Sequence, residues 1–341
     1  MALLTDKQRL QSRIALFAAA TGAFTGAMCV PMTAAAQGGP QNATPRPDSV
    51  EVQQHIAAAQ SLATGILQTP FEFFCVPGNA RPNSFTAPNL VPVQLFDNLY
   101  ALGNSETVVH VIKTSAGLVL IDSGMPADLE TVLLPGLREL GLDPADVKLI
   151  LLGHGHVDHY GGAAYFQNRY GAQIGTSEAD WQTIDAERTS DDVNKPAPDL
   201  VIHDREPVIV GDTEILPVAI PGHTPGSLAF IFPVQDAGVS HTAGLFGGTV
   251  LAAGYVKTPG LVQYVESIDS YLTVASQMKV DVEIQNHPIF DDTPGRIAAL
   301  ARRQAGQAHP FVIGSDQYQK FWRIVSECMQ AEIIRREEAA P

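Results

Sequence analysis

Three histidines and one aspartate fall within the six consecutive positions His154 to His159, directly after the apolar run Val147–Leu152. A continuous apolar run of this length is typical of a buried strand, so the chain must turn from strand to helix at the polar cluster. Imidazoles gathered this closely would repel one another when protonated. Imidazole nitrogens and carboxylate oxygens are ligands that zinc binds at about 2.0–2.2 Å. The segment therefore predicts a metal centre, in preference to isolated hydrogen-bonded histidines.

The rest of the chain shows the sequence pattern of a fold that mixes helices and strands. Short apolar runs separated by turn residues predict neighbouring antiparallel strands between Val91 and Ile121, and more strands between Pro207 and Phe246. Helices are expected over Pro126–Leu140, Gly161–Tyr170, Ser177–Ala186, Ile268–Met278, Pro294–Gln304 and Tyr318–Arg336. Strands grouped with helices in two successive halves predict an α+β fold, a four-layer αββα sandwich, over residues 91–293.

Two flanking segments complete the predicted organisation. Residues 50–90 form an N-terminal arm that wraps the domain, with a helix over Val50–Leu67 and irregular structure over Pro70–Pro92. Residues 294–341 form a C-terminal helical segment packed on the domain. Neither flank carries a recognisable chemical motif.

The cluster His-x-His-x-Asp-His after a strand resembles the zinc motif of the metallo-β-lactamase superfamily. Three other segments match that family's signatures: Leu118–Gly124, Pro221–Ser227 and Gln285–Pro288. The resemblance implies two zinc ions, one held by His154, His156 and His223 and the other by Asp158, His159 and His287. It also implies that Asp122 supports the ligands through hydrogen bonds, although Asp122 could simply be a turn residue that ends a strand.

The segment before the last ligand indicates a branch of the superfamily. Glyoxalase II-like thioesterases and lactonases of this family place a metal-bridging aspartate there, but the segment Leu245–Thr249 has no carboxylate, and Asp236 lies earlier in an apparent loop. The first β-lactamase subclass would have cysteine at Thr249. The chain is therefore most similar to the third subclass, which uses neither group.

The resemblance also suggests substrate-binding residues. Thr249 would replace a serine that binds the substrate carboxylate, and Tyr255 matches a tyrosine near the oxyanion. Leu251 stands where that subclass has a second serine, and a leucine side chain donates no hydrogen bond. This departure weakens the expectation of strong β-lactam binding.

The implied activity is hydrolysis of a β-lactam ring by a zinc-bound hydroxide, with Asp158 and Tyr255 as catalytic residues. A related zinc hydrolase acting on a lactone, a thioester or a sulfate or phosphate ester is the alternative. A third alternative is a non-enzymatic zinc-binding protein. A missing ligand in the motif would be the sequence feature that favours it. The histidines outside the motifs are expected to be surface or hydrogen-bonded side chains: His55, His110, His203, His241 and His309.

The first residues predict export. Lys7, Arg9 and Arg13 precede the apolar stretch Ile14–Val30, and small residues follow at Ala34–Ala36. This order is typical of a secretory signal peptide, over residues 1–36, with a flexible leader over residues 37–49. A retained membrane helix and a lipoprotein anchored through Cys29 are alternatives. Cleavage predicts a periplasmic or secreted protein with no membrane attachment.

Cysteine usage and charge limit the partners. After cleavage Cys75 and Cys328 remain, and they form either a disulfide between the N-terminal arm and the last helix or two buried thiols. The formal charge of −15 would repel the phosphates of nucleic acid, so we expect a small-molecule substrate and no nucleic acid. The sequence contains no signal for an oligomeric state.

Overall fold

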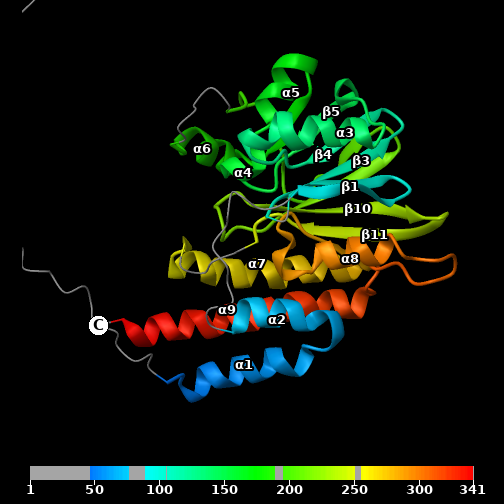
Figure 1. The fold of residues 1–341 in the computed structure, drawn as a ribbon. Helices are drawn as coiled ribbons and strands as arrows, with labels where there is room; N and C mark the ends of the chain where they lie inside the picture. Colours follow the sequence, from blue (N-terminus) through cyan, green and yellow to red (C-terminus); the bar gives the residue numbers. More distant parts are fainter. Residues whose placement is uncertain (1–46, 77–88, 105, 189–194, 250–254, 341) are drawn as a thin grey trace, which may run out of the picture. The chain divides into compact units, whose positions relative to one another are not determined.

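Two β-sheets packed face to face form the centre of the fold (Figure 1). The structure is a computed structural model that describes residues 47–76, 89–104, 106–188, 195–249 and 255–340. The larger sheet has seven strands in the order β1-β2-β3-β4-β5-β6-β7, and the smaller has five in the order β12-β11-β10-β9-β8. Strands β1 to β4 pair antiparallel and β4 to β7 parallel, and in the smaller sheet β11 and β12 are the parallel pair.

The element bounds follow the chain. The larger sheet consists of β1 (Asn89–Phe96), β2 (Leu99–Asn104), β3 (Val108–Thr114), β4 (Gly117–Ile121), β5 (Val147–Leu151), β6 (Gln173–Thr176) and β7 (Leu200–Val201). The smaller consists of β8 (Val208–Val210), β9 (Thr213–Ala219), β10 (Leu228–Asp236), β11 (Val239–Phe246) and β12 (Val282–Ile284). The α-helices are α1 (Val50–Leu62), α2 (Gln68–Cys75), α3 (Leu134–Glu139), α4 (Val157–Tyr160), α5 (Ala163–Tyr170), α6 (Glu178–Ala186), α7 (Thr258–Gln277), α8 (Thr293–Leu300) and α9 (Ser315–Ala339).

Strand β4 shows how the apolar pattern builds the layers. Side chains alternate between the two faces of a strand. Leu118 and Leu120 pack in the cluster that includes side chains of α3, α5 and α6, whereas Val119 and Ile121 face the second sheet. Because both faces are buried, the strand is apolar throughout. The predicted αββα sandwich is confirmed.

The smaller sheet is covered by α7 and α9, and α1 and α2 pack on α9 (Figure 1). Trp322 of α9 stacks on Phe246 at the end of β11, with ring centroids 4.2 Å apart. The N-terminal arm and the C-terminal segment therefore meet in one helical layer outside the sandwich.

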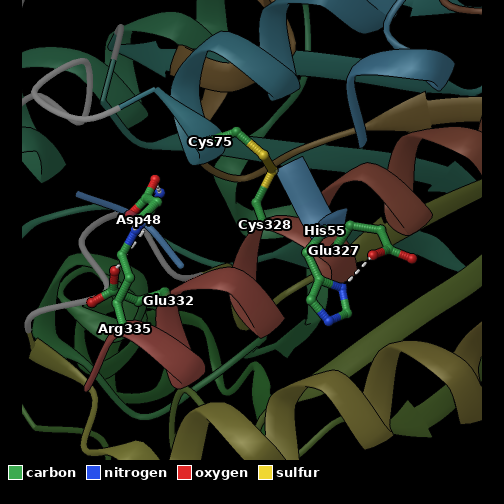
Figure 2. The surroundings of a disulfide bond; sticks show 7 residues. All are labelled: Asp48, His55, Cys75, Glu327, Cys328, Glu332 and Arg335. Atoms are coloured by element: carbon green, nitrogen blue, oxygen red, sulfur yellow. Dashed lines mark hydrogen bonds and ion pairs between the residues drawn. A yellow bond between two sulfur atoms is a disulfide. The ribbon is translucent and has the colours of Figure 1, made fainter. Parts of the chain in front are cut away.

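Covalent and ionic contacts fix this outer layer (Figure 2). A disulfide of 1.96 Å joins Cys75 at the end of α2 to Cys328 of α9. The carboxylate of Asp48 accepts two hydrogen bonds of 2.8 Å from Arg335, and His55 Nδ1 lies 2.6 Å from Glu327 Oε2. The disulfide and the His55 contact link the N-terminal arm to α9, and Asp48 links the residues just before the arm to the same helix.

Four expectations about secondary structure need correction. The single helix predicted over Pro126–Leu140 is a 3-10 turn (Pro126–Asp128), a π-helical turn (Leu129–Leu133) and the short α3, because Pro135 cannot donate to the preceding turn. The region predicted as irregular contains α2, whose Phe71, Phe73 and Cys75 are buried.

The other two corrections concern α7 and β10. Helix α7 begins ten residues before the predicted Ile268, since Pro259 lies in its first turn, where proline is compatible with a helix. Asp236 ends β10 instead of lying in a loop, and its carboxylate pairs with Arg303 at 2.6 Å.

Candidate metal centre

The parallel strands β4 and β5 end side by side, and the residues that follow them form the first half of the site. Ile121 pairs with Leu151, so Asp122 and the segment from Leu152 leave the same edge of the sheet. His156 has extended backbone angles and precedes the first turn of α4, which carries Asp158 and His159. The smaller sheet supplies the other half, with His223 between β9 and β10 and His287 after β12.

Three imidazoles form the first cluster of donor atoms. His223 Nε2 lies 3.0 Å from His154 Nε2 and 3.1 Å from His156 Nδ1. His154 is 1% exposed, and the other two are partly buried. Their donor atoms all lie within 4.8 Å of one another, so the structure brings the first predicted ligand set together.

Two imidazoles and a carboxylate form the second cluster. His159 Nε2 lies 3.1 Å from His287 Nε2, and Asp158 Oδ2 lies 3.2 Å from the first nitrogen and 3.7 Å from the second. The rings of His154 and His159 are 3.9 Å apart between centroids, so the clusters adjoin. The second predicted ligand set is therefore also assembled.

The spacing and protonation of these groups fit a metal. Donor atoms at about 2.0–2.2 Å from a tetrahedral zinc lie about 3.3–3.6 Å from one another. Burial and the neighbouring imidazoles lower the pKa of His154 and of His223 well below the ordinary value. Both imidazoles are therefore neutral at pH 7. Burial alone would lower the pKa of His159 too, but the carboxylates of Asp158 and Asp122 raise it to about 10. The two carboxylates thus favour positive charge at this position.

Hydrogen bonds to the far side of three rings fix their orientation. His154 Nδ1 lies 2.6 Å from Gly247 O, and His287 Nδ1 lies 2.6 Å from Glu106 O. A carbonyl oxygen only accepts, so each Nδ1 must donate and each Nε2 keeps its lone pair toward the cluster. His159 Nδ1 makes the corresponding contact with Asp122 Oδ2 at 2.7 Å.

Asp122 does more than end a strand. Its side chain is fully buried, and its Oδ1 accepts a 2.7 Å hydrogen bond from Gly153 N. Its Oδ2 contacts His159 and accepts from Asn286 Nδ2 at 3.0 Å. A φ of 63° places its backbone in the left-handed region, which aspartate and asparagine adopt more readily than most residues. The carboxylate thus joins both ligand-bearing segments.

Sequence reasoning missed two buried residues at this site. Asn286 Nδ2 donates to Asp122 and, at 3.0 Å, to Gly247 O. Asp180 accepts hydrogen bonds from the two segments that carry His156 and His223. The only available signal for Asp180 was its place three residues after Ser177, which does cap α6. That spacing indicates a helix start and says nothing about a second role.

The predicted substrate residues are placed less favourably than the ligands. Thr249 is 0% exposed, and its hydroxyl lies 3.1 Å from Phe246 O and 3.2 Å from Gln285 Oε1, so it points into the protein. Tyr255 is 89% exposed, and no described residue holds its ring against the clusters. Leu251 lies outside the described residues. These placements do not support the carboxylate-binding role predicted for Thr249.

A small pocket of about 100 Å³ opens beside Asp158. Its wall also includes Asn104, Thr107, Met125 and Asp128. Burial raises the pKa of Asp128, whose Oδ2 accepts a 3.1 Å hydrogen bond from Asn104. Asp158 is the member of the second cluster that lines this pocket.

The remaining histidines belong to neither cluster. His55 and His241 contact the carboxylates of Glu327 and Asp281, and His309 Nε2 lies 2.8 Å from Leu95 O. His203 is exposed. His110 departs from the expectation, because it is 1% exposed and its Nδ1 has no hydrogen-bond partner among the described residues.

Residues 102–240 match the model of the metallo-β-lactamase superfamily, in agreement with the two-sheet fold and the arrangement of the histidines and Asp158. Among solved structures the chain is similar to BJP-1, a subclass B3 metallo-β-lactamase of Bradyrhizobium japonicum, with 28% identity and a TM-score of 0.57 over 75% of this chain and 95% of that one. The FEZ-1 enzyme of Legionella gormanii, 22% identical with a TM-score of 0.58 over 76% and 98% of the chains, shares the fold.

Curated relatives match over shorter stretches. An N-acyl homoserine lactonase of a Bacillus species is 26% identical over 179 residues, which cover 43% of this chain and 68% of that protein. The exodeoxyribonuclease WalJ of Streptococcus pneumoniae is 31% identical over 88 residues, 26% of this chain and 31% of its own length. The chain thus matches about a third of the nuclease.

Proposed function

We propose that the protein is an exported dinuclear zinc hydrolase that opens β-lactam rings. The observation that carries this proposal is the pair of adjoining three-donor clusters, one of three imidazoles and one of two imidazoles and a carboxylate. Two bound zinc ions would supply a hydroxide near neutral pH and would polarise a carbonyl group. Similarity to BJP-1 supports a β-lactam substrate.

Asp158 would take part in the reaction as well as in metal binding. Its carboxylate belongs to the second cluster, and its residue also lines the pocket. It would therefore orient the attacking water toward the substrate carbonyl. Ring opening joins the water oxygen to the carbonyl carbon, breaks the C–N bond and leaves the nitrogen to accept one proton.

A lactone is the second candidate substrate. The lactonase of the Bacillus species supports it by similarity over 68% of its length. The inward hydroxyl of Thr249 favours it too, because a β-lactam carboxylate would find no donor there. Thioesters and sulfate or phosphate esters belong to the same chemistry. The acidic charge of −15 disfavours a nucleic acid substrate despite the short match to WalJ.

The test uses the purified mature protein. Zinc per chain is measured first, and turnover of a chromogenic cephalosporin is then compared with lactone, thioester and sulfate-ester panels. We expect two zinc ions and cephalosporin hydrolysis that a chelator abolishes. Inactivity on the cephalosporin with turnover of a lactone would replace the substrate but keep the site.

Two ligand variants test the site itself. Asp158→Ala and His154→Ala should abolish hydrolysis, because each removes one of three donors from a cluster. Asp292→Asn, an exposed position, serves as a control that should keep full activity. Turnover retained by either ligand variant at unchanged zinc content would contradict the assignment.

Export is proposed from the N-terminal residues. None of the described helices combines the length and apolar character that crossing a bilayer requires; residues 1–46 lie outside that search. We expect the mature protein, isolated from the periplasm or the medium, to begin at Gln37. Mass spectrometry of the intact protein distinguishes this N-terminus from a lipidated Cys29 or an uncleaved chain.

A further inference from the structure

The carboxylate of Asp180 contacts both loops that carry ligands of the first cluster. Its Oδ2 accepts a hydrogen bond of 2.9 Å from Gly155 N, the residue between His154 and His156. The same oxygen accepts one of 2.7 Å from the hydroxyl of Thr224, and Oδ1 accepts one of 3.2 Å from Gly226 N. Thr224 directly follows His223. One side chain therefore connects a loop of the larger sheet to a loop of the smaller sheet.

The first turn of α6, which holds Asp180, is seated tightly between these loops. Ser177 caps the helix and also donates a 2.7 Å hydrogen bond to Gly226 O. A Cβ on Gly226 would lie 2.1 Å from Ser177 Oγ, and one on Gly155 would lie 2.9 Å from Asp180 O. Both glycines are needed because the helix and the loops approach this closely. Asp180 is 0% exposed, so water does not replace its contacts.

The second cluster has a different support. Its histidine His159 contacts Asp122, and His287 contacts the backbone of Glu106. Among the described residues, Asp180 makes no hydrogen bond to Asp158, His159 or His287. Asp122 thus contacts a histidine of the second cluster directly and reaches the first through Gly153 N, whereas the hydrogen bonds of Asp180 go to the two loops that carry ligands of the first cluster.

We propose that Asp180 is a positioning residue that holds His156 and His223 at metal-binding distance and thereby sets the affinity of the first metal site separately from the second. This inference rests on the proposed dinuclear centre. Hydrogen-bond partners that orient metal ligands typically change metal affinity by about 10–100-fold when they are removed. The effect should therefore be confined to the site with three imidazoles.

The experiment measures metal binding to each site. Apo-protein is titrated with ¹¹³Cd²⁺ and followed by NMR, where an all-nitrogen site and a site with a carboxylate give separate resonances. In competition with a chelator, Asp180→Ala should lose about 10–100-fold in affinity at the all-nitrogen site and keep the affinity of the other. Asp122→Asn should lose affinity mainly at the site with the carboxylate, because Asp122 contacts His159 directly and the first cluster only through Gly153 N.

Two further variants separate positioning from general loss of structure. Thr224→Val keeps the carboxylate but removes one of its three contacts, so it should weaken the same site by less, even if Asp180→Ala fails to fold. Asp281→Ala removes a distant carboxylate that accepts from Thr242 N and contacts His241, and it should leave both sites unchanged.

The outcomes are distinct. Equal loss at both sites in Asp180→Ala and Thr224→Val, or no loss in either, would overturn the inference while the dinuclear centre stands. The same site-selective loss in Asp281→Ala would also overturn it. A wild-type protein that gives a single cadmium resonance at saturation would overturn both this inference and the proposed function.

Discussion

At the residue scale, the direction of each imidazole decides whether the six predicted ligands can bind metal together. The sequence showed that the histidines follow strand ends, and parallel strands deliver their ends to one edge. It could not show that Gly247 O and Glu106 O would orient His154 and His287, because these acceptors are backbone atoms from distant segments. Asp180 was missed for the same reason, since its partners lie 25 and more residues away.

Asp122→Asn tests the orienting role of a carboxylate. An amide has one acceptor oxygen and one donor group, so it cannot accept from Gly153 N, His159 and Asn286 at once. Asparagine tolerates the left-handed backbone, so the loss should fall on the metal and not on the turn. Zinc affinity should drop about 10–100-fold in a chelator competition.

The matched control is Asp292→Asn, which makes the same change at another left-handed position with φ 55° that is exposed. Its zinc affinity should equal that of the wild type. If Asp122→Asn also binds zinc as tightly as the wild type, Asp122 does not orient His159.

His110 should make stability depend on pH. Burial lowers its pKa from 6.5 to about 4, so in the folded state it stays neutral while the unfolded chain takes up a proton near pH 6.5. Stability is therefore lost as the pH falls from about 6.5 to about 4, by an amount on the order of 3 kcal/mol at 1.4 kcal/mol per pKa unit.

Urea unfolding between pH 4 and pH 7, at saturating zinc, measures this loss. His110→Leu should flatten the pH dependence relative to the wild type, because leucine takes up no proton. His203→Asn, at an exposed position, should leave the profile unchanged. Parallel profiles for wild type and His110→Leu would show that His110 does not titrate as expected.

At the element scale, periodicity predicted the strands well, because burial on both faces makes β4 and β5 apolar throughout. Helices were less predictable where packing overrides local signals. Pro135 splits a segment whose apolar spacing looks helical, and α2 forms because Phe71 and Phe73 pack into a core supplied by α9 and α7. The packing partners of α2 lie outside its own segment, whereas the break at Pro135 follows from a residue within the segment.

Helix α8 is joined to β12 by a buried ion pair. Arg296 lies 2.5 Å from Glu283 and 3.0 Å from Asp291, and its guanidinium is 4.3 Å from the centroid of the Phe311 ring. Arg296→Met would leave the carboxylates buried without a cation. We expect a loss of about 3–5 kcal/mol in the free energy of unfolding.

Denaturant unfolding checks this value. The control Arg303→Met breaks a more exposed pair with Asp236 and should cost about 1 kcal/mol or less. Adding Glu283→Gln to Arg296→Met should recover part of the loss, since it removes one unpaired charge. Equal costs for the two arginine variants would show that burial does not set the energy of the ion pair.

At the scale of the whole molecule, the sequence predicts the sandwich of two sheets. It does not predict that the two ends of the chain meet in a helical layer outside the sandwich. The sequence left the pairing of Cys75 and Cys328 open, because two cysteines carry little pattern. Packing of α1 and α2 on α9 brings the sulfur atoms together. Contacts between the two ends of a chain depend on the completed fold.

The disulfide should contribute to global stability. It spans 253 residues and restricts the unfolded chain, so Cys75→Ala/Cys328→Ala should lower the free energy of unfolding by about 2–5 kcal/mol. Wild-type protein in a reducing agent should lose a similar amount in urea unfolding at saturating zinc. The zinc content of both should remain that of the oxidised wild type, because the bond lies in the outer helical layer; a loss of zinc would contradict this separation.

The same bond turns most of the molecule into a closed covalent ring. A protease that cuts any loop between Cys75 and Cys328 opens the ring without releasing a fragment, since both new ends stay attached through sulfur. In a compartment where proteases act on exported proteins, a nicked molecule would keep its two sheets, and hence both halves of the metal centre, within reach of each other. Such a molecule would migrate as one band before reduction and as two after it.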